Sequence, residues 1–351
     1  MELKQLHKEN QELVIGFAES RVGGRPENQD SFGVKDTRLG FLVTVCDGMG
    51  GGPGGRTAST IAVQEIIAGV EEASQEETIP NILIKAVRRA NMAIIAAGNE
   101  TPSLKGMGST ATVLLVNERA AYIAHVGDSR VYQFRGHKKI FRTFDHSMVF
   151  DLVKQGVITE EQARLSAQSN IITRALGIQP DVEVDVVEVS YEKGDRFMLC
   201  SDGIHGSMPE AELIKKATNR KQVLGALTDD IATTVDNNGR TAGGGHDNLT
   251  LALIETKKNS KLKPRMSKTN KLTLLVLAVA CFISICLNII QCNGKSASDL
   301  DEAAMVALRS QLRNDSVVHA QDSIRMDSLQ KANNALTEKI TKSLNILNNK
   351  K

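Results

Sequence analysis

The sequence predicts an α+β fold over residues 1–256, followed by a single membrane-spanning helix. Short β-rich runs lie close together in the chain, are joined by short polar turns, and have two helical stretches between them. The spanning helix is predicted from a nineteen-residue run without a charge, Leu272–Ile290. The chain has 351 residues, of which 41% are hydrophobic and 24% charged, so it has enough apolar side chains for a folded core.

The individual elements are predicted from the period of the apolar residues. Strands are expected in six runs of five to eight residues, at 41–45, 110–116, 120–126, 182–189, 196–200 and 248–255. Helices are expected at 54–72 and 79–97, where apolar residues recur at helical spacing. A further helical stretch at about 147–167 has few residues typical of a core, and we expect it to form a mobile flap.

Five aspartates are predicted to stand at the ends of apolar strands, next to Gly, Ser or Asn. They are Asp30 (RPENQD), Asp47 (TVCDGMGGGPGG), Asp128 (HVGDSR), Asp202 (LCSDGIHG) and Asp247 (GGGHDNLT). One such Asp is usually a turn former or a helix cap. Five carboxylates gathered in one domain would repel one another unless cations lay between them. Because the donors are all oxygens, the pattern predicts two Mg²⁺ or Mn²⁺ ions rather than Zn²⁺. Such a pair would activate water and hold a phosphoryl group.

Two further features lie close to these aspartates in the sequence. Arg25 precedes Asp30 by five residues, and its guanidinium would bind phosphate oxygens at the rim of the same site. Glycines within 50–55 match the GxGxxG pattern of a dinucleotide-binding loop. However, the charge of Asp47 would oppose a pyrophosphate, and Glu71 ends a helix instead of a second strand. A nucleotide-binding oxidoreductase is therefore excluded.

Taken together, these residues resemble the metal-dependent protein phosphatase family (protein phosphatase 2C type) in its bacterial form. Eight motifs occur in the family's order over about residues 13–256. They are RPENQD at 25–30, CDGMGGGPGGRTAS at 46–59, GSTATVLLV at 108–116, HVGDSRVY at 125–132, DHS at 145–147, RALG at 174–177, LCSDGIHG at 199–206 and GGGHDNLT at 243–250. The resemblance implies a four-layer α-β-β-α sandwich of two antiparallel sheets flanked by helix pairs, with metals in a cleft between the sheets.

The resemblance also implies a ligand set. Asp47 would bridge two metals, and the carbonyl of Gly48 would bind the first. Asp202 and Asp247 would complete the second. In bacterial members a third metal lies at the position of Asp128, shared with Asp202.

The implied chemistry is hydrolysis of phosphoserine or phosphothreonine by metal-bound hydroxide, without a phosphoenzyme. Asp30 would orient the water and Arg25 would bind the phosphate, so that these two and Asp47 are the expected catalytic residues. Animal relatives carry a His, their proposed general acid, where Met49 stands, so either metal-bound water or another group would protonate the leaving alkoxide. They also carry Glu where Gln29 stands. The alternative is a catalytically silent phosphoprotein-binding scaffold of the same fold, but every metal-binding position is filled.

The uncharged run predicts a transmembrane helix at 272–292. As a helix, its nineteen uncharged residues would be about 28 Å long, close to the thickness of a hydrocarbon core. Residues 257–271, a basic juxtamembrane linker, carry seven Lys/Arg and no acidic residue, whereas Lys295 alone follows the run closely. The positive-inside rule then places the catalytic domain in the cytoplasm and the tail, 293–351, outside. The linker is expected to contact anionic lipid headgroups of the bilayer.

The remaining segments indicate partners. Residues 1–256 carry 27 Lys/Arg against 34 Asp/Glu, a net charge of −7, and the chain has no Trp, so we expect no nucleic acid. The tail has apolar residues at a 3.5-residue repeat. It is either a short coiled coil that would join copies into a homo-oligomer, or a fraying, partly disordered segment. Phosphorylated Ser/Thr proteins and a cognate Ser/Thr kinase are the expected protein partners.

Several His and Cys residues lie near the motifs. Hydrogen-bonded structural roles are expected for His125, His146, His205 and His246. Cys46 and Cys200 lie within apolar strands, and we expect them to be buried, reduced and inert.

Overall fold

The computed structural model describes residues 3–7, 11–50, 53–74, 76–168 and 170–262. They lie within one compact unit, Met1–Pro264. The predicted transmembrane helix, the tail and the linker beyond residue 262 lie outside the described residues. Among the helices that are described, none is both long and apolar enough to cross a membrane.

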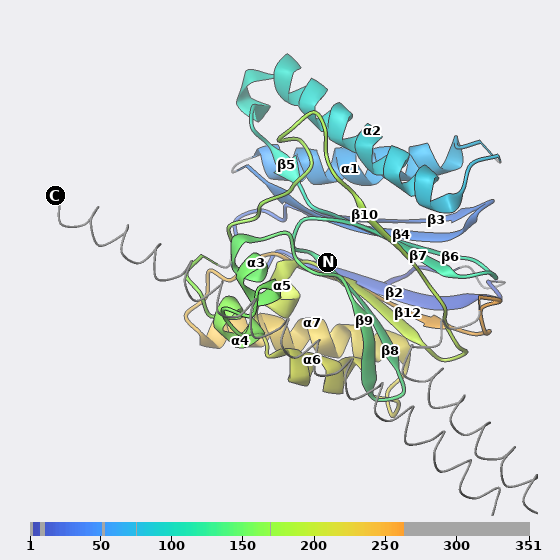
Figure 1. Cartoon of the computed structure of the whole chain (residues 1–351). Coiled ribbons are helices and arrows are strands. Elements are labelled where there is room, and N and C mark those ends of the chain that lie inside the picture. Colours follow the sequence, from blue (N-terminus) through green and yellow to red (C-terminus); the bar gives the residue numbers. More distant parts are fainter. Residues whose placement is uncertain (1–2, 8–10, 51–52, 75, 169, 263–351) are drawn as a thin grey trace, which may run out of the picture. The chain divides into compact units, whose positions relative to one another are not determined.

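Two antiparallel sheets form the centre of the unit (Figure 1). The first sheet has the order β1 (Lys4–Gln5), β2 (Val14–Arg21), β12 (Leu249–Thr256), β11 (Arg196–Cys200), β8 (Arg130–Arg135) and β9 (Lys138–Arg142). The second has the order β10 (Asp185–Val189), β7 (Ala121–Val126), β6 (Ala111–Val116), β4 (Gly40–Met49) and β3 (Asp30–Thr37), and β5 (Gly108–Ser109) pairs with the end of β4. All six strands expected from the sequence are present.

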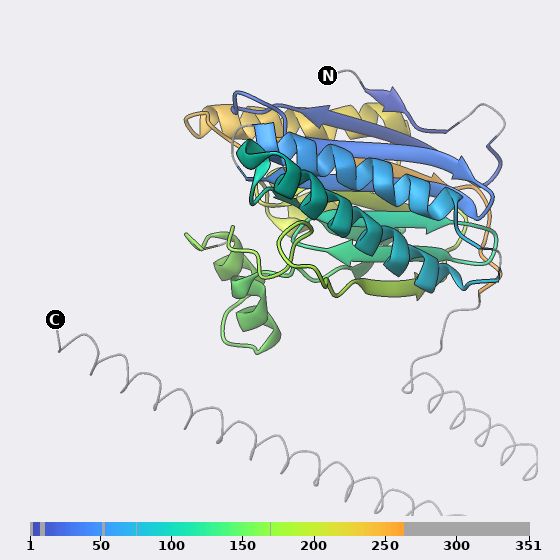
Figure 2. The same cartoon turned by 90° about the horizontal axis from the view of Figure 1, so that it is seen from above.

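Helices cover the outer face of each sheet (Figure 1). Over the second sheet lie α1 (Pro53–Glu71) and α2 (Ile79–Glu100), which run side by side in the view from above (Figure 2). Over the first lie α6 (Glu210–Ala217) and α7 (Leu224–Thr241). Two short helical turns, η1 (Pro102–Leu104) and α5 (Asp202–His205), complete these layers. The α+β sandwich with its helix pairs is therefore confirmed.

Three apolar layers hold the sheets and helices together. Successive residues of a strand point to opposite faces, and β4 shows the result. Val43 packs between the two sheets, whereas its neighbour Leu42 packs under α1 and α2. On the outer face of the first sheet, Met198 packs against Ile231 of α7 in the third layer. Each such side chain contributes roughly 1.5–3 kcal/mol through its burial.

The stretch expected as a flap forms two short helices, α3 (Met148–Lys154) and α4 (Glu160–Arg164), drawn in green beside the sandwich in Figure 2. It has a small core of its own, in which Val149, Phe150 and Ala163 are buried. The Phe150 ring also lies 4.9 Å from the Arg130 guanidinium and 5.3 Å from that of Arg142. The sequence did not reveal this core.

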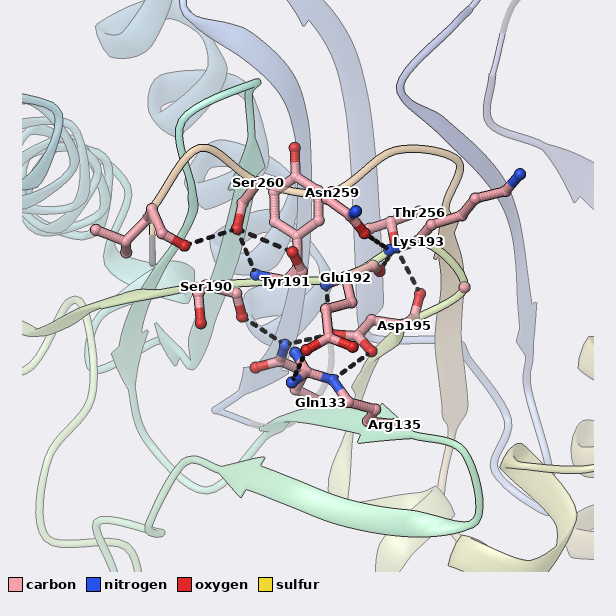
Figure 3. Close-up of polar contacts among 12 residues, drawn as sticks. Gln133, Arg135, Ser190, Tyr191, Glu192, Lys193, Asp195, Thr256, Asn259 and Ser260 are labelled. Atoms are coloured by element: carbon pink, nitrogen blue, oxygen red, sulfur yellow. Dashed lines mark hydrogen bonds and ion pairs between the residues drawn. The ribbon is translucent and has the colours of Figure 1, made fainter. Parts of the chain in front are cut away.

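The described part of the segment assigned to the linker, residues 257–262, lies against the domain (Figure 3). Ser260 N donates to the Tyr191 carbonyl at 2.8 Å, and Tyr191 N donates to Ser260 Oγ at 2.9 Å. Lys193 N donates to Asn259 Oδ1 at 2.7 Å. Three lysines of the segment also contact the domain: Lys257 Nζ the Gln11 carbonyl, Lys258 the Glu12 carboxylate and Lys261 the Glu118 carboxylate. We call residues 257–262 the strap.

Candidate metal centre

All five aspartates come to one end of the sandwich. Asp47 lies near the end of β4, Asp128 in the turn after β7, and Asp202 two residues after the end of β11. Asp30 instead begins β3, and Asp247 lies two residues before β12, so the expectation that every one follows a strand is wrong for these two. In an antiparallel sheet the start of one strand lies beside the end of its neighbour, and both therefore meet at the same edge.

A cavity of about 470 Å³ opens between the sheets at this end. The predicted residues that line it are Arg25, Asp47, Gly48, Asp128, Asp202 and Asp247. Met49 lines it as well. Asp30 lies opposite Asp47 in the register of β3 and β4 and is only 7% exposed. Its Oδ2 accepts a hydrogen bond from Ser201 Oγ at 2.8 Å.

The backbone around Asp47 is held on two sides. Asp47 N donates to Thr110 Oγ1 at 2.9 Å, and Thr110 N donates to the Asp47 carbonyl at 2.8 Å. The Thr110 hydroxyl in turn lies 2.8 Å from Ser129 Oγ. A Cβ atom at Gly48 would lie 2.0 Å from the Gly55 carbonyl oxygen, so only glycine allows β4 to approach the first turn of α1 this closely.

Burial, together with mutual repulsion, raises the pKa of the clustered carboxyls. Burial raises the pKa of Asp47 well above its ordinary value, and the charges of Asp30 and Asp202 add to the effect. Burial, and then the charges of Asp202 and Asp247, raise the pKa of Asp30 to about 7. Burial, and then the charge of Asp247, raise the pKa of Asp202 to about 6. The pKa of Asp128 is raised as well, first by burial and then by the charge of Asp202. These carboxylates are stable together in ionised form only with a compensating positive charge.

The donor set fits divalent cations. Asp202 Oδ1 is buried and accepts no hydrogen bond from any residue that the structure describes. Leaving such an oxygen without a partner costs about 1–3 kcal/mol or more, and a cation would supply the missing contact. Carboxylate and carbonyl oxygens are the ligands that Mg²⁺ and Mn²⁺ prefer.

Arg25 is tied to the same centre. Its Nη2 donates to Asp247 Oδ2 at 3.0 Å, and about half of the side chain is exposed. Asn248, which sequence reasoning missed, joins the two loops: its Nδ2 donates to the carbonyls of Val22 and Glu27 at 2.8 and 2.9 Å. Asn248 follows Asp247 directly in the GGGHDNLT motif, and that position was the available signal.

Comparisons with known proteins show the family to which the chain belongs. A family model described as Protein phosphatase 2C matches residues 19–240. The chain belongs to the protein phosphatase 2C family. It is 34% identical over 245 residues to the serine/threonine phosphatase stp of Listeria monocytogenes, a match that covers 68% of this chain and 94% of that protein.

Solved structures of other phosphatases have the fold of this phosphatase. The serine/threonine phosphatase of S. agalactiae superposes with a TM-score of 0.63 at 30% identity, over 70% of this chain and all of that one. The catalytic domain of the phosphatase PstP, solved with two manganese ions, has a TM-score of 0.58 at 29% identity, over 70% of this chain and 99% of that one. These matches confirm the resemblance drawn from the eight motifs, and with it the prediction of a metal-dependent phosphoprotein phosphatase.

A second group of potential ligands in this phosphatase does not include the aspartate cluster. Within the described ranges, the ligand atoms of His125, His146 and Asp185 form the one such set lying within 4.8 Å of one another. Gly127 N donates to His146 Nδ1 at 3.0 Å, so the ring proton is on Nε2, 3.2 Å from Asp185 Oδ2. Arg174 also pairs with Asp185 at 2.9 Å. Because His146 has no free lone pair to offer, we assign no metal to this group.

The remaining His and Cys residues behave as the sequence predicts. His205 and His246 each make a hydrogen bond within the phosphatase domain through Nε2, at 3.0 and 2.8 Å. Burial raises the pKa of both strand thiols, Cys46 and Cys200, to about 12. A thiol with so high a pKa forms almost no thiolate at neutral pH and is therefore inert.

Proposed function

We propose that this protein is a membrane-anchored protein serine/threonine phosphatase that hydrolyses phosphoserine and phosphothreonine with a metal-activated water. The observation that carries the proposal is the set of buried carboxyls with raised pKa around one cavity, with an arginine at its rim. The relatives named above, which are serine/threonine phosphatases, support the substrate class.

The residues divide into metal ligands and substrate contacts. Asp47, the Gly48 carbonyl, Asp202 and Asp247 would hold two cations, with Asp128 beside a third. Such cations would supply an activated water and would neutralise charge on the phosphoryl group. The comparison structure that contains two manganese ions supports this choice of metal.

The chain's own side chains orient the reactants. Asp30 Oδ1 is buried without a hydrogen-bond donor among the described residues, so it would accept a hydrogen bond from the attacking water and direct its lone pair. Arg25 presents a planar pair of donors that suits phosphate oxygens. The thioether of Met49 has no proton to donate, so in this proposal the leaving alkoxide takes its proton from water in the cavity.

The membrane part of the proposal rests on the sequence. The apolar run at 272–290 is long enough to span a bilayer, and the basic residues before it favour a cytoplasmic catalytic domain and an external tail. The substrates of the phosphatase must first be phosphorylated by a Ser/Thr kinase. Such a kinase is therefore a proposed partner in the same pathway. Joining of copies through the tail remains a prediction.

Two experiments test the proposal. Asp47→Ala should abolish hydrolysis of p-nitrophenyl phosphate while the circular dichroism spectrum stays unchanged, and EDTA should silence the wild-type enzyme until Mn²⁺ is restored. Turnover in Asp47→Ala equal to wild type would refute the metal assignment. Protease added to intact spheroplasts should remove only the tail, and loss of the catalytic domain would reverse the proposed orientation.

A further inference from the structure

The loop that carries Asp247 is built from residues that do not fix its shape. Gly243, Gly244 and Gly245 precede His246 and all have positive φ, at 110°, 75° and 71°. Three consecutive glycines have more backbone freedom than any other tripeptide and lose the most entropy when they are ordered. Something outside the glycines must therefore hold the Asp247 carboxylate in place.

His246 provides such a contact with α7. Its Nε2 donates to Asp236 Oδ1 at 2.8 Å, and the two side chains are 10% and 12% exposed. Its ring lies against Gly239, one turn further along the helix, where a Cβ atom would be 2.1 Å from His246 Cγ. The absence of a side chain at 239 is what lets the ring lie this close to the helix.

Asp236 also forms ion pairs with two arginines. Its Oδ2 lies 3.0 Å from Arg240 and 3.8 Å from Arg21, which also pairs with Asp229 and Glu19. The carboxylate that accepts the His246 hydrogen bond is thus also paired with two arginines, and it can act as an anchor for the loop.

His246 is also linked to the part of the cavity where Arg25 would bind phosphate. Gly24 N donates to the His246 carbonyl at 2.9 Å, and the next residue, Arg25, donates to Asp247 at 3.0 Å. Release of His246 would therefore loosen both the carboxylate and the arginine.

We propose that His246 and Asp236 are positioning residues that fix the glycine loop to α7, and through it set the geometry of Asp247 and Arg25. This inference rests on the proposed role of Asp247 as a metal ligand. It concerns this chain's own residues: the anchor is a histidine inside the loop motif, ten residues from its partner.

Mn²⁺ binding to the purified full-length chain tests the inference directly, by isothermal titration calorimetry without substrate. We expect His246→Ala and Asp236→Ala to weaken Mn²⁺ binding about 10-fold or more, the usual effect of losing a residue that orients a ligand. His246→Gln should recover part of the affinity, because its Nε2 can still donate to Asp236. Asp230→Ala is the matched control: it removes the 3.0 Å ion pair between α7 and Lys216 and should leave binding unchanged.

Gly239→Ala tests the same contact from the side of the helix. Its methyl carbon would lie 2.1 Å from His246 Cγ and must displace the ring, so Mn²⁺ binding should weaken as it does in His246→Ala. In the double variant Gly239→Ala/His246→Ala the methyl meets no ring, and binding should be no weaker than in His246→Ala alone. Additive losses in the double variant would overturn the inference.

Activity provides a second readout. With saturating Mn²⁺, His246→Ala should recover much of its kcat for p-nitrophenyl phosphate but keep a raised KM, because Arg25 has lost its fixed position. A role confined to folding would lower kcat with the folded fraction and leave KM and Mn²⁺ affinity as in wild type.

Asp247→Asn is the reference variant for the metal assignment itself. If it weakens Mn²⁺ binding and His246→Ala does not, only the present inference fails. If Asp247→Asn has no effect, the metal assignment fails.

Discussion

Without metal, the phosphatase domain should become less stable as the pH rises from 4 to 8. Asp30 and Asp202 have pKa values of about 7 and about 6 in the folded protein, against roughly 3.9 for an unfolded Asp. Between these values the folded state keeps protons that the unfolded state has released. The free energy of unfolding therefore falls as the pH rises through this window, the reverse of the usual behaviour of a salt-bridged carboxylate.

The effect should be large. A pKa difference of one corresponds to about 1.4 kcal/mol, so the two carboxyls together cost several kcal/mol by pH 8. That is a substantial part of the roughly 5–15 kcal/mol by which a typical domain is stable. For a domain of this size each kcal/mol changes the melting temperature by roughly 2–4 °C, and we expect a fall of the order of 10 °C.

Thermal melts followed by circular dichroism measure this directly, on the full-length chain in EDTA at pH 5 and pH 8. Asp30→Asn and Asp202→Asn should each reduce the difference between the two melting temperatures, and Mn²⁺ should restore stability at pH 8. Asp181→Asn, which changes an exposed carboxylate, is the control. Equal melting temperatures at both pH values in the wild-type chain would refute the reasoning.

Three further predictions concern the rest of the domain. Ending the chain after Thr256 instead of after residue 262 should lower the melting temperature, because the pairing of Ser260 with Tyr191 is lost; equal melting would show that the strap contributes nothing. Phe150→Ala should cost about 3–5 kcal/mol of local stability and speed trypsin cleavage within 147–167, with the cleavage pattern elsewhere unchanged. Cys46 and Cys200 should resist iodoacetamide in the native protein and react in guanidinium, as read by peptide mass spectrometry; labelling of native Cys46 would contradict its burial.

The strands that could be predicted from the sequence are those that consist of an almost unbroken run of apolar residues. β6, ATVLLV, is buried along its whole length. β8, RVYQFR, was missed, although five of its six residues are buried. Its Arg130 forms a bidentate pair with Asp145, at 2.7 and 2.6 Å, inside the domain. Nothing in the local sequence indicates that a charged residue has a buried partner fifteen positions away.

Helix α7 was missed for a different reason. Its sequence, LGALTDDIATTVDNNGRT, is rich in Thr, Asp and Asn, which are poor helix formers. Its helical state depends on burial of one face, including Leu227, Ile231 and Val235, against the first sheet. Tertiary packing of this kind overrides local preference and cannot be read from the segment alone.

At the candidate site, too, some residues could be predicted from the sequence and others could not. The aspartates could be predicted because each has a local signature and together they match a family order. The contact between His246 and Asp236 could not, because it joins a glycine loop to a helix that the sequence did not indicate. The sequence therefore indicated the five aspartates, and the structure was needed to find the contact between His246 and Asp236.

The two ends of the sandwich affect the stability of the domain in opposite directions. β12 runs from beside Asp247 to the strap, eight residues or roughly 26 Å. At one end, buried carboxyls oppose folding, and at the other, the strap adds hydrogen bonds between Ser260 and Tyr191. The strap bonds to Tyr191 and Lys193, which do not line the cavity, so a loss of stability at the strap should not change the geometry of the carboxyls. Substitutions at the strap should thus alter the melting temperature without altering Mn²⁺ affinity, whereas substitutions at His246 should weaken Mn²⁺ binding.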